Sequence, residues 1–263
     1  MKRFSPSSAA LALILIAIGI WGFSEHKFVG IWAPGIWPTA LRTPMIFACS
    51  LFSLGAGAGL LLPRFAPLAM RFFLAFLCVW LVWCKGLALV RAPGEFASWE
   101  SLGETSVIIS ATWLLSAFSI SRENDRPVSS AGERGPGILY GLALIAFGIS
   151  HLGYVTPTAS LVPEWLPSPV TWVYLTAATY IAAGAALVLG RFSRPAAALS
   201  ALQMALFGLL VWVPKIATGA RDADTLSETA ISFALAASGW VIWDAVKSPI
   251  IDVAPSDRTL ITA

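Results

Sequence analysis

The sequence predicts an all-α polytopic membrane protein with about eight transmembrane helices, arranged as two parallel four-helix repeats. Of its 263 residues, 57% are hydrophobic and only 12% are charged, whereas soluble domains carry about 25% charged residues. Apolar runs near the length that spans a bilayer, roughly 20 residues, recur along the chain. The two halves of the sequence also match each other in order. Together these observations exclude a water-soluble fold.

The apolar runs define the expected helices in chain order. They lie at 7–23, 43–62, 67–90, 102–120, 137–154, 169–189, 195–214 and 226–246. The first run follows Lys2 and Arg3, as in a signal peptide, but no small-residue cleavage site follows it and a similar segment recurs mid-chain. We therefore expect it to be retained as the first transmembrane helix.

A polar segment rich in Gly, Ser and Pro, SRENDRPVSSAGERGPG, separates the fourth run from the fifth and predicts a linker. The expected organisation is a first four-helix membrane repeat, a cytoplasmic linker, a second four-helix repeat and a cytoplasmic tail. Their ranges are 1–121, 122–136, 137–247 and 248–263.

Matches between the halves recur at an offset of about 124 to 130 residues, the signature of an internal duplication. Trp37-Pro38 stands opposite the WLP motif that begins at Trp165. The other aligned pairs are Gly19 with Gly148, Gly57 with Gly184, Lys85 with Lys215 and Glu104 with Glu228. Gly57 and Gly184 belong to small-residue faces that suit close helix packing.

The distribution of Lys and Arg predicts the orientation. Eleven lie on the side of the N-terminus and six on the other side. Because positive residues favour the cytoplasm, we expect a plasma membrane protein of the bacterial inner membrane with both termini in the cytoplasm. Each repeat has an even number of helices, so equivalent residues of the two repeats should face the same compartment.

Four ionisable residues are expected at the outer ends of the helices, namely Lys85, Glu104, Lys215 and Glu228. Such groups near membrane depth are candidates for function because burying them is costly. Two structural interpretations compete with this one. The glutamates, three residues after Ser101 and Thr225, would complete capping boxes, and the lysines would anchor helix C-termini. Alternatively, each lysine pairs with the glutamate of its own repeat.

His151, near the outer end of the fifth helix, is a candidate for proton exchange or ligand contact, because histidine titrates near neutral pH. A lone interfacial histidine is the competing interpretation. His26 would add a second imidazole only if the fold brings the two together. Cys49, Cys78 and Cys84 have no metal-ligand spacing, so we expect no metal site and interpret them as buried structural thiols.

Tryptophans cluster near the ends of the apolar runs and predict an aromatic belt at the membrane interfaces. They include Trp32, Trp37, Trp99, Trp165, Trp172 and Trp212. Stacking on a flat cofactor such as a quinone is an open alternative, and no other cofactor is indicated. The sequence has no Walker A, GxGxxG or HExxH motif, so ATP-driven transport lacks its usual machinery.

The second half resembles the DoxX-like membrane proteins through Gly148 and His151 near the end of its first helix, the WLP loop, a small-residue second helix and the following Arg191. The first half resembles them more weakly, through GFSEHKF, IWP and LPRFAP. The resemblance implies a four-helix unit, here duplicated, in a family named for a subunit of thiosulfate oxidation with quinone as acceptor. Many members carry a glutamate where this chain has Tyr180 and, in the first copy, Ser53, which weakens the case for proton or redox work.

We therefore expect a DoxX-like accessory protein, without catalytic activity of its own, that binds a ligand or partner at its outer face. Tyr180 joins the histidines, lysines and glutamates as a candidate ligand-binding residue, and no catalytic residue is assigned. The expected partners are the lipid bilayer and another membrane or periplasmic protein, not nucleic acid. Two alternatives remain open: the membrane subunit of a quinone-linked oxidoreductase, and a small-solute transporter.

Overall fold

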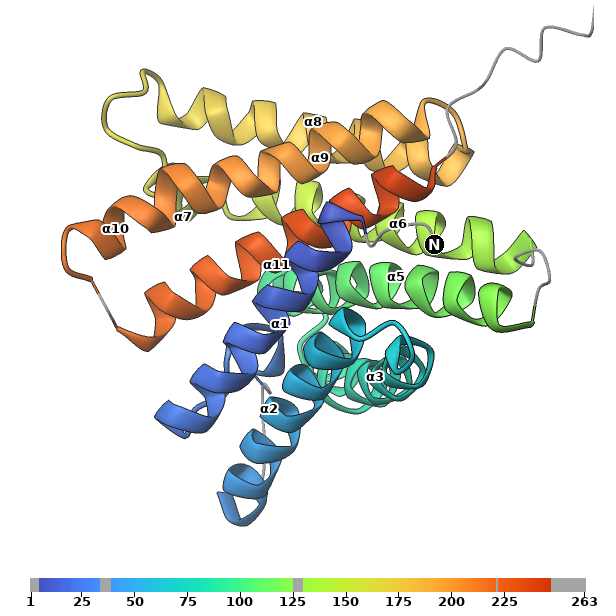
Figure 1. The fold of residues 1–263 in the computed structure, drawn as a ribbon. Helices are drawn as coiled ribbons and strands as arrows, with labels where there is room; N and C mark the ends of the chain where they lie inside the picture. The colour runs from blue at the N-terminus through green and yellow to red at the C-terminus, as the bar shows by residue number, and fades with distance from the viewer. Residues whose placement is uncertain (1–4, 34–38, 125–129, 221, 247–263) are drawn as a thin grey trace, which may run out of the picture.

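A computed structural model describes residues 5–33, 39–124, 130–220 and 222–246. Within these ranges, eight helical spans are long and apolar enough to cross a membrane, which confirms the predicted all-α membrane fold (Figure 1). The Trp37-Pro38 match, Arg221 and the predicted tail at 248–263 lie outside the described residues.

The first repeat contains four spans and one short loop helix. The spans are α1 (Pro6–Glu25), α2 (Thr39–Leu61), a continuous third span and α5 (Phe96–Asn124). The third span joins α3 (Ala66–Trp80), the π-helical segment η2 (Leu81–Gly86) and α4 (Leu87–Arg91). A 3₁₀ helix, η1 (Gly30–Trp32), lies in the loop after α1.

The second repeat follows the same order. Its spans are α6 (Ser130–Gly153), α8 (Pro169–Leu189), a continuous third span and α11 (Ala223–Ala245). The third span joins α9 (Ser193–Phe207), the π-helical segment η3 (Gly208–Trp212) and α10 (Val213–Ala217), and a short helix α7 (Val155–Ala159) follows α6. Both third spans therefore contain a π segment, a feature often found at functional sites.

Helix α6 begins inside the segment expected to be a linker. Its Pro136 lies within the helix. Just before it, a side-chain carbon on Gly135 would collide with the Trp113 ring of α5. The glycine therefore allows α6 to lie directly against α5, and this packing favours a helix where the local sequence suggests a loop.

The two repeats pack in the same way and meet at their fourth helices. Helix α1 packs on α2 as α6 packs on α8, and α3 packs on α5 as α9 packs on α11. Each first helix also contacts the fourth helix of the other repeat, and α5 contacts α11. Figure 1 shows α5 and α11 near the centre, with α2 and α3 on one side and α8 and α9 on the other.

Aligned glycines have equivalent packing roles. A side-chain carbon at Gly19 of α1 would lie 2.7 Å from the Ser50 carbonyl oxygen of α2. At Gly148 of α6 it would lie 2.7 Å from the Ala177 carbonyl oxygen of α8. At both positions the absence of a side chain allows the two helices to approach closely. A second aligned pair meets the backbone of its partner helix in the same manner: Gly57 and Gly184.

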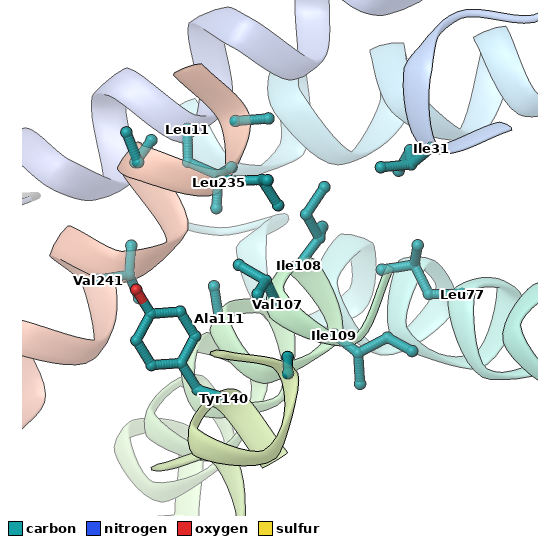
Figure 2. Packing of buried hydrophobic residues seen from close by; sticks show 14 of the residues in the cluster. Leu11, Ile31, Leu77, Val107, Ile108, Ile109, Ala111, Tyr140, Leu235 and Val241 are labelled. Carbon is teal, nitrogen blue, oxygen red and sulfur yellow. The ribbon is translucent and has the colours of Figure 1, made fainter. Parts of the chain in front are cut away.

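The core lies where both fourth helices meet. Figure 2 shows Val107 and Ala111 of α5 in the same buried cluster as Leu235 of α11. Tyr140 of α6 is fully buried at its edge, and its hydroxyl lies 2.9 Å from the Ser200 hydroxyl of α9.

Trp32 corrects one expectation. It is only 1% exposed, so its assignment to an aromatic belt is wrong. Its indole N–H donates to the Ser53 hydroxyl over 2.9 Å, and the ring packs edge-on against Trp80. Because both halves of this amphipathic side chain find partners inside the repeat, η1 turns inward rather than along the membrane interface.

Candidate functional site

A cavity of about 980 Å³ opens at the end of the bundle away from Pro6 and Ala245, where α5 and α11 begin. Its walls include the loop after α1, the first turns of α5 and α11, and part of the third span of the second repeat. This is the end predicted to face outward.

Four acidic residues line the cavity at equivalent positions of the two repeats. Glu100 and Glu104 lie one turn apart on α5, and Asp224 and Glu228 lie one turn apart on α11. Glu104 interacts electrostatically with both Glu100 and Glu228. Sequence reasoning identified Glu104 and Glu228 but missed the other two, although residues four apart share one helix face.

The helix starts rule out the expected capping boxes. Helix α5 begins at Phe96, so Ser101 lies inside the helix rather than at its N-cap. Helix α11 is capped by Asp222, whose carboxylate accepts the Thr225 N–H over 2.9 Å and the Thr225 hydroxyl over 2.7 Å. The capping prediction is therefore wrong for both glutamates, and Glu104 and Glu228 project from the second turn or beyond. The hydrogen bond from the Thr225 backbone holds the pKa of Asp222 below its usual range.

Lys85 extends from η2 into the protein and is only 3% exposed. Its ammonium donates to the Ala33 carbonyl oxygen and to the Ser101 hydroxyl, each over 2.7 Å. Lys85 also interacts electrostatically with Glu104, its predicted partner. Neither of these two hydrogen bonds, however, is made to Glu104. The Lys85 side chain therefore links the loop after η1 to the first turns of α5 through hydrogen bonds.

Lys215 has a different environment from its equivalent. It is partly exposed on α10, and its ammonium lies 4.3 Å from the centre of the Trp212 ring. It does not line the cavity, whereas Glu228, its predicted partner, does. The aligned lysines therefore have different roles: one joins two segments inside the protein and the other stacks on an aromatic ring near the surface.

A narrow pocket of about 70 Å³ shares Glu100, Glu104 and Glu228 with the large cavity and extends toward His151 and Tyr180. His151 Nδ1 lies 2.9 Å from the Phe147 carbonyl oxygen. Because a carbonyl only accepts, Nδ1 carries the hydrogen, and Nε2 of the neutral ring is left as an acceptor. The imidazole packs edge-on against Tyr180, with ring centres 5.6 Å apart.

His26 does not join His151. It is exposed at the end of α1, with its ring centre 5.3 Å from that of Phe47. Across the described ranges, no three His, Cys, Asp or Glu side chains are grouped as metal ligands. All three cysteines are free thiols; Cys49 and Cys84 are buried as predicted, but Cys78 is exposed, so the prediction of burial is wrong for it.

A family model described as a domain of unknown function (DUF8561) matches residues 140–234. The matched range runs from α6 into α11 and includes His151, Tyr180 and Glu228. No curated protein and no solved structure matches the chain.

Proposed function

We propose that this protein is a DoxX-like accessory protein of the bacterial inner membrane that binds a small organic amine, as its cation, in the acidic cavity at its outer face. The observation that carries the proposal is the convergence of four carboxyl groups, from equivalent positions of two repeats, on one cavity of about 980 Å³. The DoxX-like assignment rests on the pattern of glycine, histidine and the WLP loop in the second half.

The charges around the cavity favour a cationic ligand. Glu100, Glu104 and Glu228 are partly buried, whereas the basic residues of the lining, Lys27 and Arg42, are exposed. The ammonium of Lys85 already donates to two oxygens of the protein. Carboxylates near membrane depth are costly without a countercharge. A ligand ammonium supplies both the missing positive charge and hydrogen-bond donors for several carboxylate oxygens.

The narrow pocket indicates what else the ligand carries. Phe147, Phe207 and Tyr180 form much of its wall, and His151 lies among them. Aromatic rings attract both apolar groups and cations. The site therefore suits an amine with a short alkyl or aryl substituent, whose apolar part enters the narrow pocket while its ammonium stays among the carboxylates.

Calorimetric titration of the protein in lipid nanodiscs with benzylammonium tests this proposal, with benzyl alcohol as the neutral comparison. We expect binding of the cation and not of the alcohol. The double variant Glu104→Gln, Glu228→Gln should weaken binding at least about tenfold, because charge-assisted hydrogen bonds are lost.

Glu164→Gln is the matched control, since Glu164 is exposed and lies outside both pockets. Equal binding of the alcohol, or equal weakening by Glu164→Gln, would contradict the proposal.

The proposed orientation has its own test. In a background without the natural cysteines, Ser160→Cys should react with an impermeant thiol reagent added outside the cell, and Arg64→Cys should not. Both positions are exposed and they follow different ends of the spans. Reaction of Arg64→Cys alone would reverse the orientation and place the acidic cavity toward the cytoplasm.

A further inference from the structure

A second pocket, of about 300 Å³, lies at the opposite end of the bundle from the acidic cavity. It is formed by α5, α6, the end of α8 and the end of α11. Most of its lining is apolar, including Leu114, Phe118, Ile138, Leu187 and Ile242. Among the residues that the structure describes, the lining contains one cation, Arg134, and no carboxylate.

The position of Arg134 makes this pocket amphipathic. Arg134 begins the membrane-spanning part of α6, and its side chain is exposed. A side-chain carbon on Gly190 would lie 3.7 Å from its guanidinium, and Gly190 ends α8 with a positive φ of 70°. The guanidinium therefore lies beside the left-handed turn that ends α8, a turn that glycine adopts readily, at the rim of an apolar recess.

The cation belongs to the second repeat alone. At the offset that aligns Gly19 with Gly148, Ser5 stands where the second repeat has Arg134. The Ser5 hydroxyl lies 2.7 Å from that of Ser7 and 2.9 Å from that of Ser8. The duplicated framework therefore does not itself require an arginine at this place.

We propose that this pocket binds one anionic phospholipid from the adjacent leaflet. Its acyl chain lies along the apolar wall and its phosphate contacts Arg134. Apolar walls and the Arg134 cation at the membrane surface complement the two parts of such a lipid. The planar guanidinium also matches phosphate oxygens in two parallel hydrogen bonds. This site does not depend on the acidic cavity or on its ligand.

Native mass spectrometry of the full protein, equilibrated with equal amounts of phosphatidylglycerol and phosphatidylcholine, tests the proposal. We expect one phosphatidylglycerol molecule to be retained in preference to phosphatidylcholine. Arg134→Gln should reduce its retention about fivefold, the effect of one basic residue at a lipid surface. Arg64→Gln, which removes an arginine from the first repeat, should leave retention unchanged.

A second variant tests the apolar recess, where the acyl chain would lie, independently of the Arg134 charge. Gly137 lines the pocket, and a side-chain carbon there meets nothing within 4 Å. Gly137→Leu should therefore fold and fill the recess, and lipid retention should fall although Arg134 remains.

Three results would overturn the lipid site. They are equal retention of both lipids by the wild type, unchanged retention in Arg134→Gln, and a thermal stabilisation by inorganic phosphate as large as that by phosphatidylglycerol. The last result would assign the arginine to a free anion instead.

Discussion

The two repeats share one helical framework but differ in what fills the space between their helices. In the first repeat, Trp32 turns inward from the loop after α1 and donates to Ser53. In the second repeat, Tyr180 stands at the position equivalent to Ser53, and it lines a narrow pocket together with His151. One repeat is closed by its own loop and the other retains space for a ligand. Duplication thus preserved the packing of the helices while the loops and a few side chains diverged.

The lysines extend this comparison. Lys85 is buried and bonded to two segments, whereas Lys215 stacks on Trp212 at the surface. At the end of the bundle that holds the acidic cavity, more of the hydrogen bonds that join separate segments therefore belong to the first repeat, and the open pocket belongs to the second.

Trp32→Ala should have the largest effect on stability. It removes a fully buried indole, its hydrogen bond to Ser53 and its ring contacts, which should lower the free energy of unfolding by about 3 to 5 kcal/mol. Trp165→Ala is the control, because Trp165 is 68% exposed and its loss should change stability by about 0.5 kcal/mol or less. Reversible unfolding in mixed micelles measures both. Similar losses would mean that Trp32 does not close the first repeat.

Lys85→Met should have an intermediate effect on the free energy of unfolding. The variant keeps the length of the side chain but loses the hydrogen bonds to Ala33 and Ser101, at a cost of about 2 kcal/mol. Lys215→Met loses only a cation–π contact near the surface, worth about 0.5 kcal/mol. The same unfolding measurement compares the two. Equal costs would show that the aligned lysines have equal roles.

Asp222 should make a small contribution to the stability of the fold, and that contribution should depend on pH. The pKa of its carboxyl group is lowered by the hydrogen bond from the Thr225 backbone. Because the folded-state pKa is below the unfolded value, its stabilisation is fully present above the unfolded pKa, about 3.9, and is lost as pH falls through the folded pKa. Asp222→Asn keeps the cap but cannot titrate. The difference in melting temperature between wild type and variant should therefore shrink or reverse below about pH 4. A constant difference would contradict the capping role.

Much of the framework was predictable because the signals are local or repeated. The glycine pairs fixed the register between the first two helices of each repeat, and the S/T-x-x-E pattern, at a slightly shorter offset, placed Glu104 opposite Glu228. Glu100 and Asp224 were missed because they precede the apolar runs that marked helix starts. The S/T-x-x-E pattern was misleading because the same spacing occurs inside a helix. The observed helix starts, at Phe96 for α5 and after the Asp222 cap for α11, reveal the difference.

The burial of Trp32 was equally inaccessible to sequence reasoning. A tryptophan in a loop near the end of an apolar run has the sequence position that is typical of tryptophans at the membrane interface. Its partners, Ser53 on α2 and Trp80 on α3, are separated from it in the chain. The open pocket beside His151 and Tyr180 depends in the same way on which side chains enter from other segments.

The most direct test of the account gives the second repeat the residues of the first. At the offsets that align the glycine pairs, Gly22 stands opposite His151 and Ser53 opposite Tyr180. The double variant His151→Gly, Tyr180→Ser can be titrated with benzylammonium in nanodiscs, with circular dichroism as the check on folding. We predict at least about tenfold weaker binding at unchanged helical content, because the ligand loses an acceptor and an aromatic wall. Unchanged affinity in a folded variant would contradict the assignment of the ligand site to the second repeat.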